Sequence, residues 1–84
     1  MTDWFVYLLR CADGSLYAGI TTDLTRRVAE HNEGAAGARY TRGRRPVALA
    51  YHERHPDRAA ASRRERQIRR LRKIDKERLI ATAR

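Results

Sequence analysis

The sequence predicts one α+β domain in which strands and helices follow one another in the order β-β-α-β-α-α. Two observations carry this prediction. Three segments rich in β-branched, aromatic and apolar residues are separated by amphipathic segments with helix start and stop signals. The chain has 84 residues, enough for one small domain, residues 1–84, with a single modest core. Three strands with helices segregated around them are typical of the α+β class.

The first two strands are predicted to form a β-hairpin. Residues 4–11, WFVYLLRC, and residues 16–21, LYAGIT, have similar compositions that favour strands. Asp13-Gly14 between them is a turn signal. The length of the connecting loop then fixes which side chains share a face of the sheet, because a shift of one residue moves every side chain to the other face.

The register decides whether Tyr7 and Tyr17 lie on the same face of the sheet. A two-residue loop pairs Tyr7 with Ile20 and sends the two phenols to opposite faces. A three-residue loop pairs Tyr7 with Gly19 and puts both phenols on one face. We prefer the three-residue loop, because it places Gly14 at the left-handed position of a type I turn with a bulge, where glycine carries no steric cost.

The first helix is predicted in the segment that follows the hairpin. Thr22 or Asp23 can cap its N-terminus, and Leu24 and Val28 lie four residues apart, as on one face of a helix. Gly34 is a stop signal. We therefore expect a helix of about three turns.

The second half of the chain is predicted to hold one strand and two helices. Residues 34–46 show no periodicity and are expected to form a loop. Residues 47–53, VALAYHE, are predicted as the third strand, which can pair with either strand of the hairpin. A long helix is expected from residues 56–57, with a break near residues 73–75 and a short final helix through residues 79–80.

The net charge of +9 is concentrated in the second part of the chain. Residues 1–53 contain 7 basic and 6 acidic residues, whereas residues 54–84 contain 12 and 4. This asymmetry is typical of a protein that binds a polyanion, with nucleic acid first and an anionic membrane surface second, and a merely solvated helix is the alternative. Because arginine suits bidentate phosphate contact, we expect nucleic-acid contacts from Arg39, Arg42, Arg66 and Arg70.

The same composition indicates the compartment. Cys11 is the only cysteine, so no intramolecular disulfide can form and a reducing environment fits. No apolar run comes near the roughly 20 residues needed to span a bilayer, and the N-terminus has no signal-peptide pattern. We therefore expect a cytoplasmic monomer without a membrane partner.

A candidate site follows from the predicted hairpin and first helix. Arg27 and His31 lie four residues apart, so they adjoin on the helix surface. With Tyr7 and Tyr17 they are expected to line one concave patch, where Gly19 leaves open space in which the Tyr7 phenol can meet a ligand. The alternative is that the tyrosines pack in the sheet and that Arg27 and His31 are ordinary surface residues.

Glu65 is the candidate carboxylate of the long helix. It projects about 60° from Ile68 around the helix axis. This position is at the border of the apolar stripe and is poorly suited to ordinary solvation. The alternative is that Glu65 only offsets its neighbours Arg64, Arg66 and Arg69.

The order and spacing of these residues resemble the GIY-YIG nuclease domain, and more closely its small stand-alone bacterial branch, the YhbQ-like proteins. The first motif is Phe5-Val6-Tyr7 and the second is Tyr17-Ala18-Gly19. They are followed by TTDLTRRVAEHN at 21–32, by ARYT at 38–41 and by Glu65. The family fold is a three-stranded antiparallel sheet flanked by helices, which agrees with the predicted order.

The resemblance implies a role for each residue of the candidate site. Glu65 would bind one divalent metal ion, Mg²⁺ or Mn²⁺, and Arg27 would contact the scissile phosphate. Tyr7 and Tyr17 would position or deprotonate the attacking water, with His31 as a supporting donor or proton carrier. One carboxylate with several waters is a normal site for Mg²⁺.

The implied function is a metal-dependent endonuclease that acts on DNA. We expect little sequence specificity, because the chain lacks the appended recognition module of larger family members, and RNA remains an alternative substrate. Two other functions are weighed: a nucleic-acid-binding module with little or no catalysis, and a protein-interaction adaptor or anionic-membrane binder. The chain departs from the family pattern at Phe5-Val6 and Ala18, and Glu77 lies near the place of a late asparagine in several active members.

Overall fold

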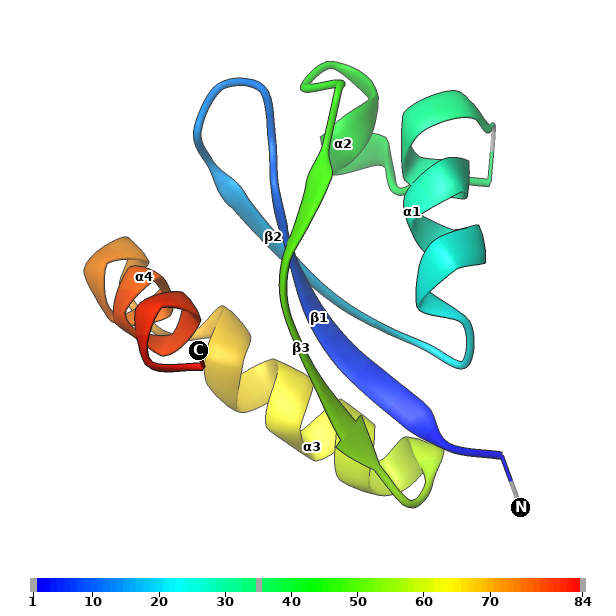
Figure 1. The fold of residues 1–84 in the computed structure, drawn as a ribbon, viewed down its shortest axis with the longest axis vertical. Coiled ribbons are helices and arrows are strands. Elements are labelled where there is room, and N and C mark those ends of the chain that lie inside the picture. The colour runs from blue at the N-terminus through cyan, green and yellow to red at the C-terminus, as the bar shows by residue number, and fades with distance from the viewer. Residues whose placement is uncertain (1, 35, 84) are drawn as a thin grey trace.

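The computed structural model describes residues 2–34 and 36–83. The described residues form strands β1 (Trp4–Arg10), β2 (Leu16–Thr21) and β3 (Ala48–His55), and helices α1 (Leu24–Glu33), α2 (Arg39–Arg42), α3 (Arg58–Arg69) and α4 (Lys73–Thr82) (Figure 1). The predicted α+β class is therefore confirmed. The predicted order also holds, with the single addition of the short helix α2 in a segment that was expected to be a loop.

The sheet is antiparallel and has the order β2-β1-β3. This order answers the question that the sequence left open, because the third strand pairs with β1 and leaves β2 at an edge. Tyr7 pairs with Gly19, and Gly14 has a φ of 83°. The three-residue hairpin loop is therefore confirmed, with glycine at its left-handed position.

Both faces of the central strand β1 are covered by helices, with α1 and α2 on one side and α3 and α4 on the other (Figure 1). Val6 and Leu8 are fully buried on the side of α3, against Ala61 and Ile68. The opposite face holds a second buried cluster, which consists of Tyr7, Leu9, Cys11 and Val47. A strand buried on both faces reads as a continuous apolar run rather than an alternating one, as WFVYLL does.

Aspartates cap the N-termini of α1 and α3. The side chain of Asp23 accepts from the backbone N–H of Arg26 at 3.0 Å, and that of Asp57 accepts from Ala60 at 2.8 Å. Each contact satisfies one of the free N–H groups of a first helical turn. The break between the last two helices falls at residues 70–72, slightly before the predicted 73–75. Among the described residues, none of the helices has both the length and the apolar character needed to cross a bilayer.

The segment between α1 and β3 is fastened to the end of α1. Arg45 Nε donates to the carbonyl of His31 at 2.6 Å, and its Nη2 donates to that of Gly34 at 2.8 Å. The side chain of Asn32 accepts from the N–H of Val47 at 2.7 Å and donates to its carbonyl at 2.9 Å. The two Arg45 contacts satisfy carbonyls at the C-terminal end of α1, and together with the Asn32 contacts they hold this segment beside the helix.

Candidate active site

A cavity of about 580 Å³ lies along the outer edge of β2. Its lining includes the consecutive residues 16–20 of β2, so the cavity touches both faces of the sheet at this edge. Four of the five predicted site residues also line it: Tyr7, Tyr17, Arg27 and Glu65. Because α1 and α3 cover opposite faces of the sheet, the edge of β2 is where a side chain of each helix can reach the same space.

Tyr7 does not face open space, contrary to expectation. Its side chain is only 2% exposed, and a Cβ built at Gly19 would lie 2.5 Å from Tyr7 Cζ. The phenol ring itself therefore fills the room above Gly19. The hydroxyl of Tyr7 lies 2.9 Å from His31 Nε2, so Tyr7 is a buried phenol that reaches the cavity only at its edge.

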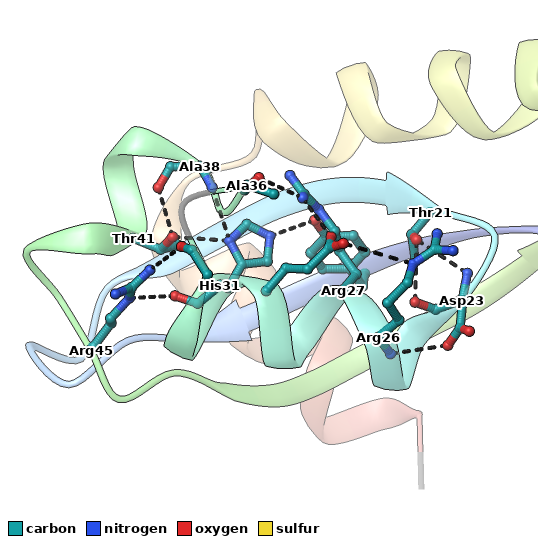
Figure 2. Close-up of polar contacts among 12 residues, drawn as sticks. Thr21, Asp23, Arg26, Arg27, His31, Ala36, Ala38, Thr41 and Arg45 are labelled. Carbon is teal, nitrogen blue, oxygen red and sulfur yellow. Dashed lines mark hydrogen bonds and ion pairs between the residues drawn. The ribbon is translucent and has the colours of Figure 1, made fainter.

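His31 was expected on the surface of α1, but it is fully buried and does not line the cavity. The ring lies in edge contact with Tyr7 and Tyr17, at centroid distances of 5.9 and 5.4 Å. Its Nδ1 lies 2.9 Å from Thr41 Oγ1 and 3.3 Å from the N–H of Ala38 (Figure 2). Segment 36–47 folds over the end of α1 and buries the ring, which spacing within one helix cannot predict.

Proton counting favours one tautomer of His31. Thr41 Oγ1 donates to the carbonyl of Ala38 at 2.8 Å. A hydroxyl has a single proton, so while Thr41 donates to Ala38 it can only accept at its 2.9 Å contact with Nδ1. The ring then carries its proton on Nδ1, and Nε2 accepts from the Tyr7 hydroxyl. The longer 3.3 Å contact from Ala38 suits the other tautomer, in which Thr41 turns its proton to Nδ1.

Burial determines the protonation of this pair. The pKa of His31 is lowered to about 4, mainly because burial disfavours the imidazolium and secondly because of the charge of Arg27. The pKa of Tyr7 is raised, again mainly by burial, although a hydrogen bond from Arg27 opposes this. At neutral pH both groups are therefore uncharged, which agrees with a neutral imidazole that accepts from a phenol.

Arg27 is held in place by its own helix and by the segment that covers it. Its Nη1 donates to Glu30 Oε1 at 2.9 Å and to the carbonyl of Ala36 at 2.8 Å (Figure 2). The guanidinium carries further N–H groups, so these contacts orient it without using all its donors. An oriented arginine beside a cavity is suited to bind a phosphate.

Glu65 provides a carboxylate oxygen without a hydrogen bond. Its Oε2 is buried, and although Arg69 Nη2 lies 3.1 Å away, the two atoms are not aligned for a hydrogen bond. A buried oxygen with unused acceptor capacity fits a hard divalent cation, which prefers carboxylate ligands. In the described part of the chain no three acidic, histidine or cysteine side chains converge, so such an ion would complete its shell with water and substrate oxygens.

Two site features were not predicted. Tyr40 stacks on Tyr17 at a centroid distance of 5.7 Å, and Arg44 Cζ lies 3.9 Å from the centre of the Tyr40 ring. Lys76 of α4 lines the cavity as well. The ARYT tetrapeptide was the only sequence signal for Tyr40, and no signal in the sequence indicated Lys76.

Glu77, which lies near the place of the family's late asparagine, has a structural role in this chain. Arg10 donates to its two carboxylate oxygens at 2.8 and 2.6 Å, and this ion pair joins α4 to β1. The hydrogen bonds from Arg10 lower the pKa of Glu77 to about 2. Glu77 does not line the cavity, so it does not take the place of the late asparagine.

The predicted nucleic-acid contacts fall in different places. Arg66 lines a smaller hollow together with Glu65, next to the cavity. Arg39, Arg42 and Arg70 are exposed and lie outside the lining of the cavity.

Comparison with known proteins identifies the family of this chain. Residues 3–78 match the model of the GIY-YIG catalytic domain. A UPF0213 protein of Desulfotalea psychrophila is 56% identical over 77 residues, which cover 92% of this chain and 70% of that protein. The UPF0213 protein YhbQ of Escherichia coli is 47% identical over 81 residues, which cover 96% of this chain and 80% of YhbQ.

Two solved structures have the same fold. The solution structure of a UPF0213 protein from Bacillus halodurans superposes with a TM-score of 0.61 at 40% identity, covering 95% of this chain and 84% of that one. A solution structure from E. faecalis superposes with a TM-score of 0.66 at 37% identity, covering 98% and 86%. The chain therefore belongs to the GIY-YIG family, in its UPF0213 branch.

Proposed function

We propose that this protein is a divalent-metal-dependent endonuclease that hydrolyses phosphodiester bonds in DNA with little sequence preference. The observation that carries the proposal is the buried Glu65 Oε2, which has no hydrogen-bond partner and belongs to a cavity also lined by Tyr7, Tyr17 and Arg27. The guanidinium of Arg69 lies 3.1 Å from this oxygen and offsets part of its charge, but makes no hydrogen bond to it. The unused acceptor capacity of the oxygen therefore favours a cation bound beside it.

Glu65 would hold Mg²⁺ or Mn²⁺, which would stabilise the negative charge on the departing oxygen. Arg27 binds a non-bridging oxygen of the scissile phosphate and orients it. Tyr17 lies at the cavity wall with Tyr40 stacked against it, so its hydroxyl orients the attacking water.

The proton of the attacking water leaves through Tyr7. As the water oxygen bonds to phosphorus and the bond to the leaving oxygen breaks, one water proton passes to the Tyr7 oxygen. The phenolic proton of Tyr7 passes at the same time to His31 Nε2, 2.9 Å away. The leaving oxygen takes a proton from solvent, and His31 later returns its proton through Tyr7. The relay avoids a free tyrosinate, which the raised pKa of Tyr7 disfavours.

A nucleic-acid-binding module without catalysis is the second candidate. It is favoured by the low pKa of His31, about 4, because a weak base makes a slow proton acceptor. On this reading the site residues would hold the fold, and the basic side chains, including Arg39, Arg42, Arg66 and Arg70, would bind the phosphate backbone.

One assay separates the candidates. Purified protein is incubated with supercoiled DNA, single-stranded DNA and structured RNA, each with Mg²⁺, Mn²⁺ or EDTA, while binding is measured in parallel. Cleavage that requires the metal supports the nuclease, and the preferred polymer identifies the substrate. Binding without cleavage supports the second candidate, and the absence of binding contradicts both. We expect the active species to be a monomer, because one chain supplies all the residues of the cavity, and sedimentation under assay conditions tests this.

A further inference from the structure

We infer that the active-site cavity is the middle of a longer groove along β2, with one phosphate subsite built on Lys76 and another on Arg66. These subsites would hold the phosphates on either side of the cut bond. The inference rests on the proposed nuclease function and extends it, because it assigns how the substrate strand runs through the site. The ligand is the sugar-phosphate backbone, independent of base sequence.

The first argument is the continuity of the hollows. A hollow of about 400 Å³ beside the hairpin turn shares Leu16 and Lys76 with the central cavity. A smaller one of about 150 Å³ shares Ile20 and Glu65 with it and adds Arg66. The three hollows therefore adjoin along the length of β2, and the candidate metal ligand Glu65 lies where the central cavity meets the hollow of Arg66.

The second argument is the open backbone of β2. Since the sheet order is β2-β1-β3, β2 pairs only with β1. Every second backbone N–H of β2 therefore points away from the sheet. Backbone N–H groups are common donors to phosphate oxygens in nucleic-acid complexes, and residues 16–20 of this open strand line the cavity.

The third argument is the distribution of charge. Most nearby basic side chains are already paired with an acidic one: Arg64 with Glu53, Lys73 with Glu77, and Arg72 and Arg78 with Asp75. Within residues 2–34 and 36–83, Lys76 and Arg66 have no such partner although both line the groove. Lys76 is moreover half-buried. An ammonium group that is partly removed from water and unpaired favours an anionic ligand.

The groove sets a minimum length for the substrate. Its ends lie beside Leu16 and Ile20, which are about 13 Å apart along an extended strand. This distance corresponds to about four nucleotides at the rise of duplex DNA. A strand must therefore continue on both sides of the scissile phosphate, and bonds close to a free end should be cut poorly.

The first test measures binding without catalysis. The affinity for a short duplex is measured by fluorescence anisotropy in EDTA over a range of salt concentrations, for the wild type, Lys76→Ala, Arg66→Ala and the double variant. Each single change should lower the slope of log affinity against log salt by about 0.9, and the double change by about 1.8. The matched control is Arg63→Ala on α3, which is exposed, has no ion pair among the described residues and lies about 160° around the helix from Glu65.

The second test uses end-labelled oligonucleotides with Mg²⁺. Wild-type protein should leave the bonds within about two nucleotides of either end uncut. Lys76→Ala should permit cuts nearer to one end only, and Arg66→Ala nearer to the other. Thermal melts of all variants check that the fold is retained.

The outcomes separate the inference from the function on which it rests. Reduced slopes for Lys76→Ala and Arg66→Ala, with an unchanged slope for Arg63→Ala, support the groove even if no variant cuts DNA, in which case only the nuclease proposal fails. Metal-dependent cleavage together with equal slopes for the wild type, Lys76→Ala, Arg66→Ala and the double variant overturns the groove and leaves the nuclease proposal in place. An equal decrease in slope for Arg63→Ala and Lys76→Ala also overturns the groove, because DNA would then contact a diffuse basic surface.

Discussion

The phenol ring of Tyr7 lies over Gly19, its partner across the β1–β2 ladder. The hairpin register thus places the one residue without a side chain opposite the one buried phenol of the site. Because the ring occupies this space, its hydroxyl is within hydrogen-bond distance of His31 at 2.9 Å. Gly19 is therefore a steric requirement of the Tyr7–His31 contact.

Gly19→Ala should displace Tyr7 and break its hydrogen bond to His31. The new Cβ would meet the Tyr7 ring at 2.5 Å from Cζ, closer than van der Waals contact allows. Overpacking of this kind and the loss of a buried hydrogen bond should each lower the free energy of unfolding by about 1–3 kcal/mol. We expect cleavage to fall by about tenfold or more, measured by nicking assays alongside urea unfolding.

Gly43→Ala is the matched control. A Cβ at Gly43 would have no atom within 4 Å, and the residue has a φ of −88°, which alanine adopts readily. Its stability and activity should stay near wild type. Equal behaviour of the two variants would show that the space above Gly19 is not critical.

The hairpin and the site residues on it were predictable because their signals are local. Asp13-Gly14 and the spacing of the two tyrosines determine the register, and the structure has the predicted pairing of Tyr7 with Gly19. The amphipathic border position of Glu65 was predictable for the same reason, since it depends only on the geometry of one helix.

The burial of His31 and the presence of Tyr40 and Lys76 were not predictable in this way. They depend on how segment 36–47 folds back on α1, through Arg45 and Asn32, and on how α4 packs against the sheet. The pairing of β3 with β1 is likewise a consequence of tertiary packing. Contacts between distant segments have no fixed spacing in the sequence, so a pattern search along one element cannot find them.

Thr41→Val should change the tautomer of His31. Valine has nearly the same shape as threonine but cannot accept the proton of Nδ1, whereas Ala38 N–H, 3.3 Å from Nδ1, can still donate to it. The ring should then carry its proton on Nε2 and donate to Tyr7, so that the relay from Tyr7 is blocked. The ¹⁵N shifts of the His31 ring report the tautomer directly, and cleavage should fall in parallel.

Thr41→Ser is the control for that change, because it keeps the hydroxyl. It should preserve the wild-type tautomer and most of the activity, at the cost of one buried methyl group. An Nδ1-protonated ring in both variants would remove Thr41 from the relay.

The stability of the protein should fall as the pH decreases from about 6.5 towards 4, because of His31. Its pKa is lowered in the fold from 6.5 to about 4, chiefly by burial. In this range the unfolded chain binds a proton that the native protein excludes, so stability is complete above about pH 6.5 and is lost as the pH falls. The loss is up to about 3 kcal/mol.

Urea unfolding between about pH 6.5 and 5 isolates this effect, because carboxylates titrate mainly below that range. His31→Gln should be less stable than the wild type at neutral pH but should show a flatter dependence on pH. His52→Gln changes an exposed histidine of β3 and should keep the wild-type slope. If His31→Gln kept that slope as well, the group responsible would lie elsewhere.

Glu65→Gln distinguishes a metal ligand from an ion-pair partner. Glutamine keeps the size and polarity of glutamate but removes the anionic oxygen that a hard cation prefers. If Glu65 binds the metal, Mg²⁺-dependent cleavage should fall by orders of magnitude. Binding of DNA in EDTA should hold or strengthen, because one negative charge that faces the phosphates is gone.

The alternative gives a different result. If Glu65 only pairs with Arg69, whose side chain is 64% exposed, its loss should cost at most about 1 kcal/mol of stability and leave cleavage near wild type. Glu33→Gln is the matched control, since Glu33 is an exposed glutamate of α1 with no ion pair among the described residues, and it should match the wild type in every measurement. A Glu65→Gln protein that folds, binds DNA and still cuts it with Mg²⁺ at the full rate would remove Glu65 from the site, and the single-metal mechanism with it.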